Sequence, residues 1–403
     1  MANILNYITD CQHENFYETP LNELDILALT EVSYLPFDDL ICPDFSAEKG
    51  IRLDDLATQF HEKFKMGYPP LSMVNRDRLA LLQSLSTSKR FKYIRAFAYI
   101  NDYSLEAQKQ FAAVCYRITP QNVLTVFRGT DDTIIGWKED FHMTYMAEIP
   151  AQAAARDYLE TAIEKLTTNF YVSGHSKGGN LAIFASSQVK TALQESIQDV
   201  YSFDGPGLHD SILQSNGYSA IENRIHSIIP EGSIVGMMLE TPRNALIVKS
   251  TGLGLGQHVS FTWEIANRTF LPAPSLTTES LQMDQTLKTW TASLTPEELK
   301  TFFDLFFGLF TQAGIYRFSD ITVDTPTKLQ ALAKNRQLLT PEENQMFERI
   351  THLLIDTRYQ IWKDQLQPLP NFDMKKLKIN LPDFHQSLSK LTEEFSDEKN
   401  KQK

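Results

Sequence analysis

The chain has 403 residues, 42% of them hydrophobic, which is enough to bury a large core. Its net charge of −12 at pH 7 would repel nucleic-acid phosphates, so nucleic acid is not an expected partner. The three cysteines form no CxxC pair and no zinc-type spacing with histidine, which favours a reducing compartment and no metal. The N-terminus lacks the pattern of a secretory signal, and no apolar run reaches about 18 residues, so we expect a cytoplasmic protein without an integral membrane segment.

Residues 1–90 are predicted to form helices and loops. Apolar residues recur at helical spacing in NELDILALTEVSYL, residues 22–35, and again in RLDDLATQFHEKF, residues 52–64. This part of the chain therefore supplies helices before the first long strand.

A run of predicted strands begins near Ile94. Each segment is short, rich in β-branched or aromatic residues, and bounded by Gly, Pro, Asn or Asp. The segments are 95–102, 109–118, 122–130, 169–176, 199–207, 224–233 and 244–252. Helical patterns at 153–166 and 177–193 lie between some of them, and such alternation is typical of an α/β protein with a mostly parallel sheet.

The chain turns helical again after the last predicted strand. Segments 295–310 and 340–362 each open on Thr-Pro-Glu-Glu, a helix start signal. We predict a first domain at 1–270, with a helical part at 1–90 and a sheet core at 91–270, and a helical C-terminal region at 271–403 whose polar tail frays. Five phenylalanines in the first segment have helical spacing and are interpreted as core, although a pocket wall or a lid is the alternative: Phe302, Phe303, Phe306, Phe307 and Phe310.

The stretch FYVSGHSKGGNLAIFAS carries a G-x-S-x-G pattern centred on Ser176. A strand before it and a helix after it indicate a nucleophile elbow, a turn so tight that Gly174 and Gly178 must lack bulk. The helix N-terminus favours a developing oxyanion there. A chance glycine pair in a strand-to-helix turn is the alternative; a phosphate-binding loop is excluded because G-x-x-x-x-G-K-[ST] is absent.

A serine hydroxyl is a weak nucleophile, so this interpretation requires a base and an acid that orients it. His258 lies in a Gly-rich loop just after the last predicted strand, where a catalytic base is expected. Its alternative is a loop histidine that caps a following helix. His226 falls within a predicted strand and is interpreted as buried and structural. The other histidines after Ser176 are less suitable, because they follow a strand too closely or belong to the C-terminal surface: His209, His352 and His385.

VLTVFRGTDDTIIGWKEDF followed by GHSKGGNLAIFA resembles the lipase class 3 group of α/β-hydrolases, and most closely its uncharacterised bacterial branch. The resemblance spans residues 94–263 and implies an α/β-hydrolase fold. It implies that Thr130, after F-R-G, gives one oxyanion amide and that Lys177 gives the other, with a W-x-x-D pattern at Trp137 and Asp140 nearby.

The predicted acid departs from that group's pattern. Where the group has a carboxylate after the next-to-last strand, this chain has Ser233, and one strand earlier it has Asp204 in place of a usual glycine. A serine cannot stabilise an imidazolium electrostatically, so we predict Asp204 as a relocated triad acid. An Asx-turn role for Asp204 before Gly205 is one alternative, and Glu231 as the acid is the other.

The sequence thus predicts a serine hydrolase for acyl esters, with Ser176, His258 and Asp204 as triad and Thr130 and Lys177 as oxyanion donors. No cofactor or metal motif occurs. The substrate is expected to be a small-molecule or lipid ester, and the sequence does not distinguish among phospholipids, glycerides and soluble esters or set the oligomeric state. The alternative function is a catalytically inactive hydrolase fold used for binding.

Overall fold

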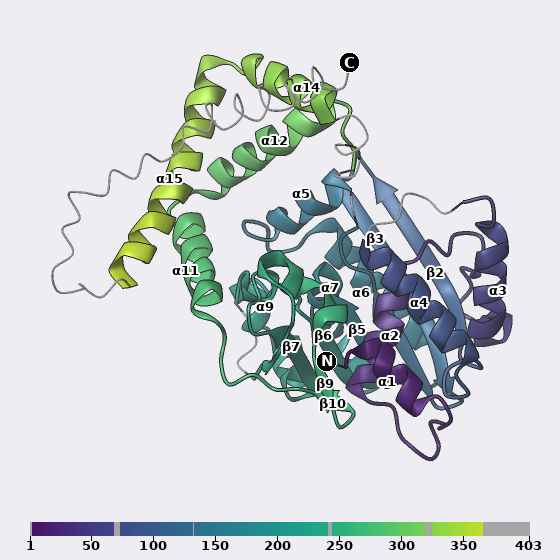
Figure 1. The fold of residues 1–403 in the computed structure, drawn as a ribbon. Coiled ribbons are helices and arrows are strands. Elements are labelled where there is room, and N and C mark those ends of the chain that lie inside the picture. Colours follow the sequence, from purple (N-terminus) through teal and green to yellow (C-terminus); the bar gives the residue numbers. More distant parts are fainter. Residues whose placement is uncertain are drawn as a thin grey trace.

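The computed structural model describes residues 2–67, 73–131, 133–240, 244–317, 320 and 325–365. The polar tail that was predicted to fray lies outside these residues. Within them the chain forms an eight-stranded sheet whose strands lie in sequence order, and a short hairpin of β9 (Ile265–Ala266) and β10 (Thr269–Phe270) (Figure 1). The strands of the large sheet are β1 (Ile51–Arg52), β2 (Arg95–Ser104), β3 (Lys109–Thr119), β4 (Asn122–Phe127), β5 (Asn169–His175), β6 (Ile197–Phe203), β7 (Ile225–Pro230) and β8 (Leu246–Val248).

Strands β1 to β4 pair antiparallel, and β4 to β8 pair parallel. Each of the seven predicted strand segments contains a strand, and the mostly parallel α/β-hydrolase sheet is confirmed. β1 was not predicted, because two residues give no readable alternation. Since β4 to β8 run parallel, their carboxyl ends meet at one edge of the sheet, where an open α/β sheet carries its ligand site.

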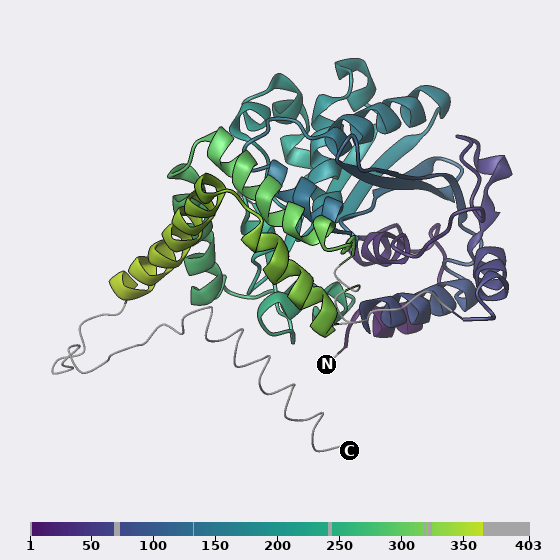
Figure 2. The same ribbon diagram turned by 90° about the horizontal axis from the view of Figure 1, so that it is seen from above.

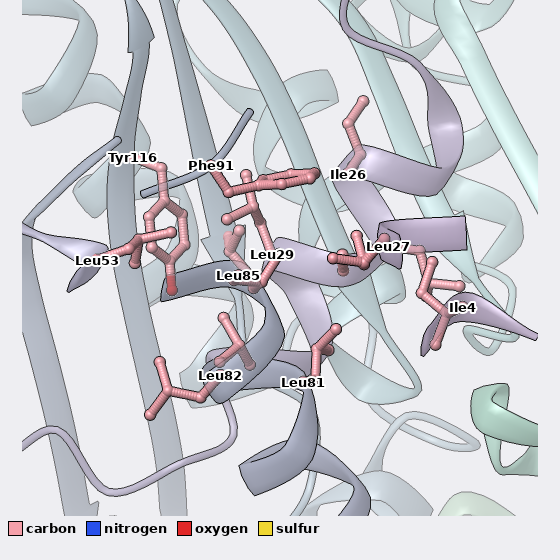
Figure 3. Packing of buried hydrophobic residues seen from close by; sticks show 14 of the residues in the cluster. Ile4, Ile26, Leu27, Leu29, Leu53, Leu81, Leu82, Leu85, Phe91 and Tyr116 are labelled. Carbon is pink, nitrogen blue, oxygen red and sulfur yellow. The ribbon is translucent and has the colours of Figure 1, made fainter. Parts of the chain in front are cut away.

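Helices cover both faces of the sheet (Figures 1 and 2). One face is covered by α1 (Ile4–Cys11), α2 (Glu23–Val32), α3 (Leu53–Lys63) and α4 (Met73–Thr87), and the other by α6 (Pro150–Lys165), α7 (Lys177–Gln188) and α10 (Asn216–Ile221). α8 (Thr191–Gln194) and α9 (Asp210–Leu213) are single turns. Figure 3 shows the first face, where leucines of α2 and α4 pack around Tyr116 of β3.

The first residues of the chain return to its last strands. The amide of Ile265 donates to the Ala2 carbonyl at 2.9 Å, and the Asn3 side chain donates to the Phe261 carbonyl at 2.9 Å. The amino terminus is therefore tied to the segment that follows β8.

A C-terminal group of helices projects beyond the sheet (Figure 1). It comprises α11 (Thr278–Ala292), α12 (Pro296–Gln312), α14 (Thr325–Gln337) and α15 (Pro341–Gln365). It packs on α5 (Ile134–His142), where Phe141 stacks on Phe303 with ring centroids 4.6 Å apart and Lys138 pairs with Asp304 at 2.6 Å. The five phenylalanines of α12 belong to a hydrophobic cluster that also includes residues of α5, α11 and α15. Three of them are buried in it and two pack against it, as the core interpretation predicted. The proposed division at residue 270 stays a prediction.

None of the helices in the described ranges combines the length and hydropathy that a membrane span requires.

Candidate active site

Ser176 occupies a sharp corner between β5 and α7. Its backbone angles, φ 57° and ψ −135°, belong to a region that residues with side chains rarely adopt, so the surrounding packing must hold them. A Cβ on Gly174 would lie 2.1 Å from the Gly178 carbonyl, and a Cβ on Gly178 would lie 2.1 Å from the Phe127 carbonyl of β4. Both glycines are therefore required, and Ser176 is lifted to the carboxyl edge of the sheet.

Asp204 and His258 are joined at the same edge. His258 Nδ1 donates to Asp204 Oδ2 at 2.6 Å, and the Asp204 side chain is fully buried. Asp204 Oδ1 accepts from the Gly236 amide at 3.1 Å and from the Ser233 hydroxyl. Three donors thus hold the Asp204 carboxylate in place. In the described part of the chain no hydrogen bond or ion pair joins Glu231 to His258.

His258 lies beside the corner that carries Ser176. Its ring stacks on that of His175, with centroids 4.6 Å apart, and His175 Nε2 donates to the His258 carbonyl at 2.9 Å. Burial lowers the pKa of His175 to about 4, so this imidazole is neutral at pH 7. Among the described residues no hydrogen bond links Ser176 Oγ to His258. Catalytic hydrogen bonds often become short only when substrate is bound, so the lack of a Ser176–His258 hydrogen bond does not argue against a shared catalytic role.

Thr130 follows β4 directly after Gly129, at which a Cβ would lie 3.1 Å from Ser176 Cβ. Its hydroxyl donates to Asp140 Oδ2 at 2.6 Å. The backbone amides of Thr130 and Lys177 have no hydrogen-bond acceptor within the described ranges. The end of β4 packs directly on the corner, because a Cβ on Gly178 would lie 2.9 Å from the Gly129 nitrogen.

Asp140 lies on α5 with one buried oxygen, Oδ1, that has no partner among the described residues. Burial raises its pKa to about 7, and the nearby Lys177 ammonium and the Thr130 hydrogen bond oppose part of that rise. A carboxyl that titrates near neutral pH therefore adjoins Thr130.

The Lys177 side chain has a structural position that the sequence did not reveal. Its ammonium is fully buried and contacts Glu139 Oε2 at 2.8 Å, the Gln110 carbonyl at 2.9 Å and Gln110 Oε1 at 2.8 Å. Glu139 belongs to α5, a helix that was not predicted although Thr133 caps it. The ion pair links α5, which carries Asp140, to Lys177, the residue that follows Ser176.

The other histidines that follow Ser176 have no contact with the Asp204–His258 pair among the described residues. His226 was interpreted as buried, and this is wrong: its side chain is 45% exposed at the amino end of β7, where it bonds Asp199 at 2.8 Å. It is exposed because it is the second residue of its strand, at the edge opposite Ser176. His209 caps α9 and His352 lies on α15, both exposed, while His385 lies outside the described residues.

A cavity of about 370 Å³ has a lining that includes sequence neighbours of site residues but neither Asp204 nor His258. Phe141, which follows Asp140, and Met237, which follows Gly236, belong to its wall. Its lining is mostly apolar, from α5, the loops after β6 and β7, and α11: Phe141, Thr144, Leu208, His209, Asp210, Met237, Met238, Leu239, Glu240, Leu287, Lys288, Trp290, Thr291 and Ala292. Across the described residues, no group of three or more His, Cys, Asp or Glu side chains is placed to hold a metal ion.

Comparison with known proteins places the chain in a family. A family model described as Mbeg1-like matches residues 85–308, more than half of the chain. No curated protein matches the sequence. Among solved structures, the crystal structure of M37 lipase is similar at 14% identity and a TM-score of 0.35, over 54% of this chain and 70% of that one. The family is lipase-class-3-like, as the motifs at Thr130 and Ser176 suggested, and the chain belongs to the Mbeg1-like family.

Proposed function

We propose that the protein is a serine hydrolase that cleaves acyl esters through Ser176, His258 and Asp204. The hydrogen bond between His258 and the buried Asp204, at the sheet edge that presents Ser176, is the observation that carries this proposal. Membership of a lipase-like family supports it.

The proposed reaction has two acyl-transfer steps. Ser176 Oγ attacks the ester carbonyl carbon, and His258 Nε2 takes the hydroxyl proton, because Nδ1 is held by Asp204. The carbonyl oxygen becomes an oxyanion that accepts from the Thr130 and Lys177 amides. The intermediate collapses to an acyl-serine, and the alcohol leaves with the proton from His258. Water then repeats the sequence and releases the acid. Asp204 stays ionised throughout.

The proposed oxyanion hole is rigid before substrate arrives. Asp140 orients Thr130, and the Lys177–Glu139 ion pair fixes α5 against the corner. Donors that are placed in advance stabilise developing charge without reorganisation. The mostly apolar cavity whose lining includes residues of α5 and α11 is the proposed site of the acyl chain, since its lining would exclude water from hydrocarbon.

A fluorophosphonate probe tests the proposal most directly. The wild type should be labelled and should hydrolyse p-nitrophenyl esters, and Ser176→Ala should lose both properties while remaining folded. His258→Ala should lose hydrolysis. His226→Ala is the matched control, because it removes another histidine that is paired with an aspartate, far from the site. A folded wild type that is neither labelled nor active would favour the binding-scaffold alternative.

A further inference from the structure

One partly buried hydroxyl joins the two segments that flank the proposed oxyanion hole. Tyr34, two residues after α2, donates to the His175 carbonyl at 3.0 Å and accepts from the Gly129 amide at 3.1 Å. His175 immediately precedes Ser176, and Gly129 immediately precedes Thr130. The Tyr34 hydroxyl oxygen therefore contacts both segments that flank the proposed oxyanion hole.

The contact leaves no space for a side chain at Gly129. A Cβ on Gly129 would lie 2.3 Å from the Tyr34 hydroxyl, 2.4 Å from the His175 carbonyl oxygen and 3.1 Å from Ser176 Cβ. The backbone at Gly129, just after β4, is thus in close contact with His175 and Ser176. The Gly129 amide is satisfied by Tyr34, whereas the amides of Thr130 and Lys177 have no acceptor among the described residues.

Charged neighbours hold the Tyr34 ring in place. The Arg78 guanidinium of α4 lies 3.8 Å from the ring centroid and pairs with Glu31 of α2 at 2.9 Å. Glu31 is almost fully buried, and its other oxygen lies 3.4 Å from His175 Nδ1. Burial and the nearby Glu31 raise the pKa of Tyr34, so its hydroxyl keeps the proton that it donates.

Building on the function proposed above, we propose that Tyr34 is a positioning residue that sets the spacing between the two oxyanion amides. Oxyanion donors act only when they lie about 2.7–3.1 Å from the transition-state oxygen. Displacements of about 0.5 Å are enough to impair such a site. Tyr34 links the residue before Thr130 to the residue before Ser176, so it restrains both donors relative to one another.

The test compares Tyr34→Phe with Tyr116→Phe. The Tyr116 hydroxyl is buried on this face of the sheet and bonds Ser33, the neighbour of Tyr34, at 2.9 Å. Each variant removes one hydrogen-bonded tyrosine hydroxyl, but only that of Tyr34 contacts the residues that precede Thr130 and Ser176. With p-nitrophenyl butyrate, Tyr34→Phe should lower kcat by about 10- to 100-fold at constant KM, the signature of an interaction made only in the transition state. Tyr116→Phe should retain kcat.

An alkyl boronic acid supplies a second readout, because its tetrahedral adduct on Ser176 occupies the oxyanion hole. Its affinity should fall by the same factor as kcat in Tyr34→Phe and stay unchanged in Tyr116→Phe, with the folded fraction measured by thermal melting. If Tyr34→Phe does not fold, Arg78→Lys, which keeps the hydroxyl but loses the planar group over its ring, should show a smaller parallel loss.

Two outcomes would overturn the assignment in distinguishable ways. An active wild type with equal effects in Tyr34→Phe and Tyr116→Phe would show that the Tyr34 hydroxyl is only structural, and the proposed hydrolase would stand. A folded wild type without ester hydrolysis, fluorophosphonate labelling or boronate binding would remove the proposed function and the role of Tyr34 together.

Discussion

The Ser233 hydroxyl donates a hydrogen bond to Asp204 Oδ1, although the two residues follow different strands, β7 and β6. In class 3 lipases the position of Ser233 carries the acid, and that of Asp204 is usually glycine. The two side chains touch in this chain, and Asp204 uses its other oxygen to bond the imidazole of His258. This contact is consistent with our proposal that the triad acid has moved by one strand to Asp204.

We predict that Asp204→Asn keeps the fold and lowers kcat by a factor on the order of 10⁴, because the His258 ring would be held in the wrong tautomer. Glu231→Gln is the matched control and should have a mild effect, since exposed charges act only over about 10 Å at ordinary salt. Steady-state kinetics on a p-nitrophenyl ester measures both. The opposite ranking of the two variants would assign the acid to Glu231.

Ser233→Asp in the Asp204→Asn background should restore part of the lost activity. The new carboxylate would lie where the Ser233 hydroxyl now meets residue 204, within reach of His258. In the wild-type background the same substitution should lower activity, because two adjacent carboxylates raise one another's pKa. A double variant as inactive as Asp204→Asn would show that residue 233 does not reach the imidazole.

The titration of Asp140 should appear in the pH dependence of stability. Its pKa is raised from an ordinary 3.8 to about 7, so the folded state binds more protons than the unfolded state between these values. The free energy of unfolding therefore falls as pH rises through this range. In thermal melts, the melting temperature of Asp140→Asn relative to that of the wild type should be higher at pH 8 than at pH 5. Asp157→Asn, at a side chain that is 70% exposed, should show no such change.

Removing one partner of the buried Lys177–Glu139 pair should destabilise the fold strongly. Glu139→Gln leaves an ammonium buried without its counter-charge, which costs about 3–5 kcal/mol of unfolding free energy. The exposed pair of Lys190 with Glu164 is the comparison, and Glu164→Gln should change stability by less than about 1 kcal/mol. Urea denaturation measures both, and equal effects would contradict the burial of the first pair.

Filling the cavity should change the preference for acyl length. Leu287→Trp places a larger ring in the wall from α11, so kcat/KM for octanoate and longer esters should fall while that for acetate is kept. Leu281→Trp is the control, on the same helix but 48% exposed and outside the lining. If Leu287→Trp lowered kcat/KM equally for the acetate and octanoate esters, the acyl chain would not bind in this cavity.

Local patterns were sufficient to predict the sheet and the corner at Ser176. Strand periodicity and the two glycines depend on backbone sterics, which neighbouring residues in the sequence determine. The proximity of Asp204 and His258, 54 residues apart, could be inferred only through the resemblance to a known fold, and the structure brings them together.

Features that depend on side chains from distant helices could not be predicted. The sequence indicated a backbone role for Lys177 but not the buried partner of its ammonium, because Glu139 lies on a helix with no clear period. Nothing local distinguishes Tyr34 from the other tyrosines of the chain. His226 was misassigned because a strand pattern shows which residues alternate, not how far the covering helices extend along the strand.

The sequence order of the strands has a consequence for how the molecule is made. Each strand of the large sheet pairs with the one synthesised just before it, so a nascent chain can add strands vectorially, without waiting for a distant partner. Ser176 and Asp204 are synthesised before His258, because the histidine follows β8. The contacts of Phe261 and Ile265 with Asn3 and Ala2 can form only after that. The imidazole that would make the serine reactive is thus made only after all eight strands of the large sheet.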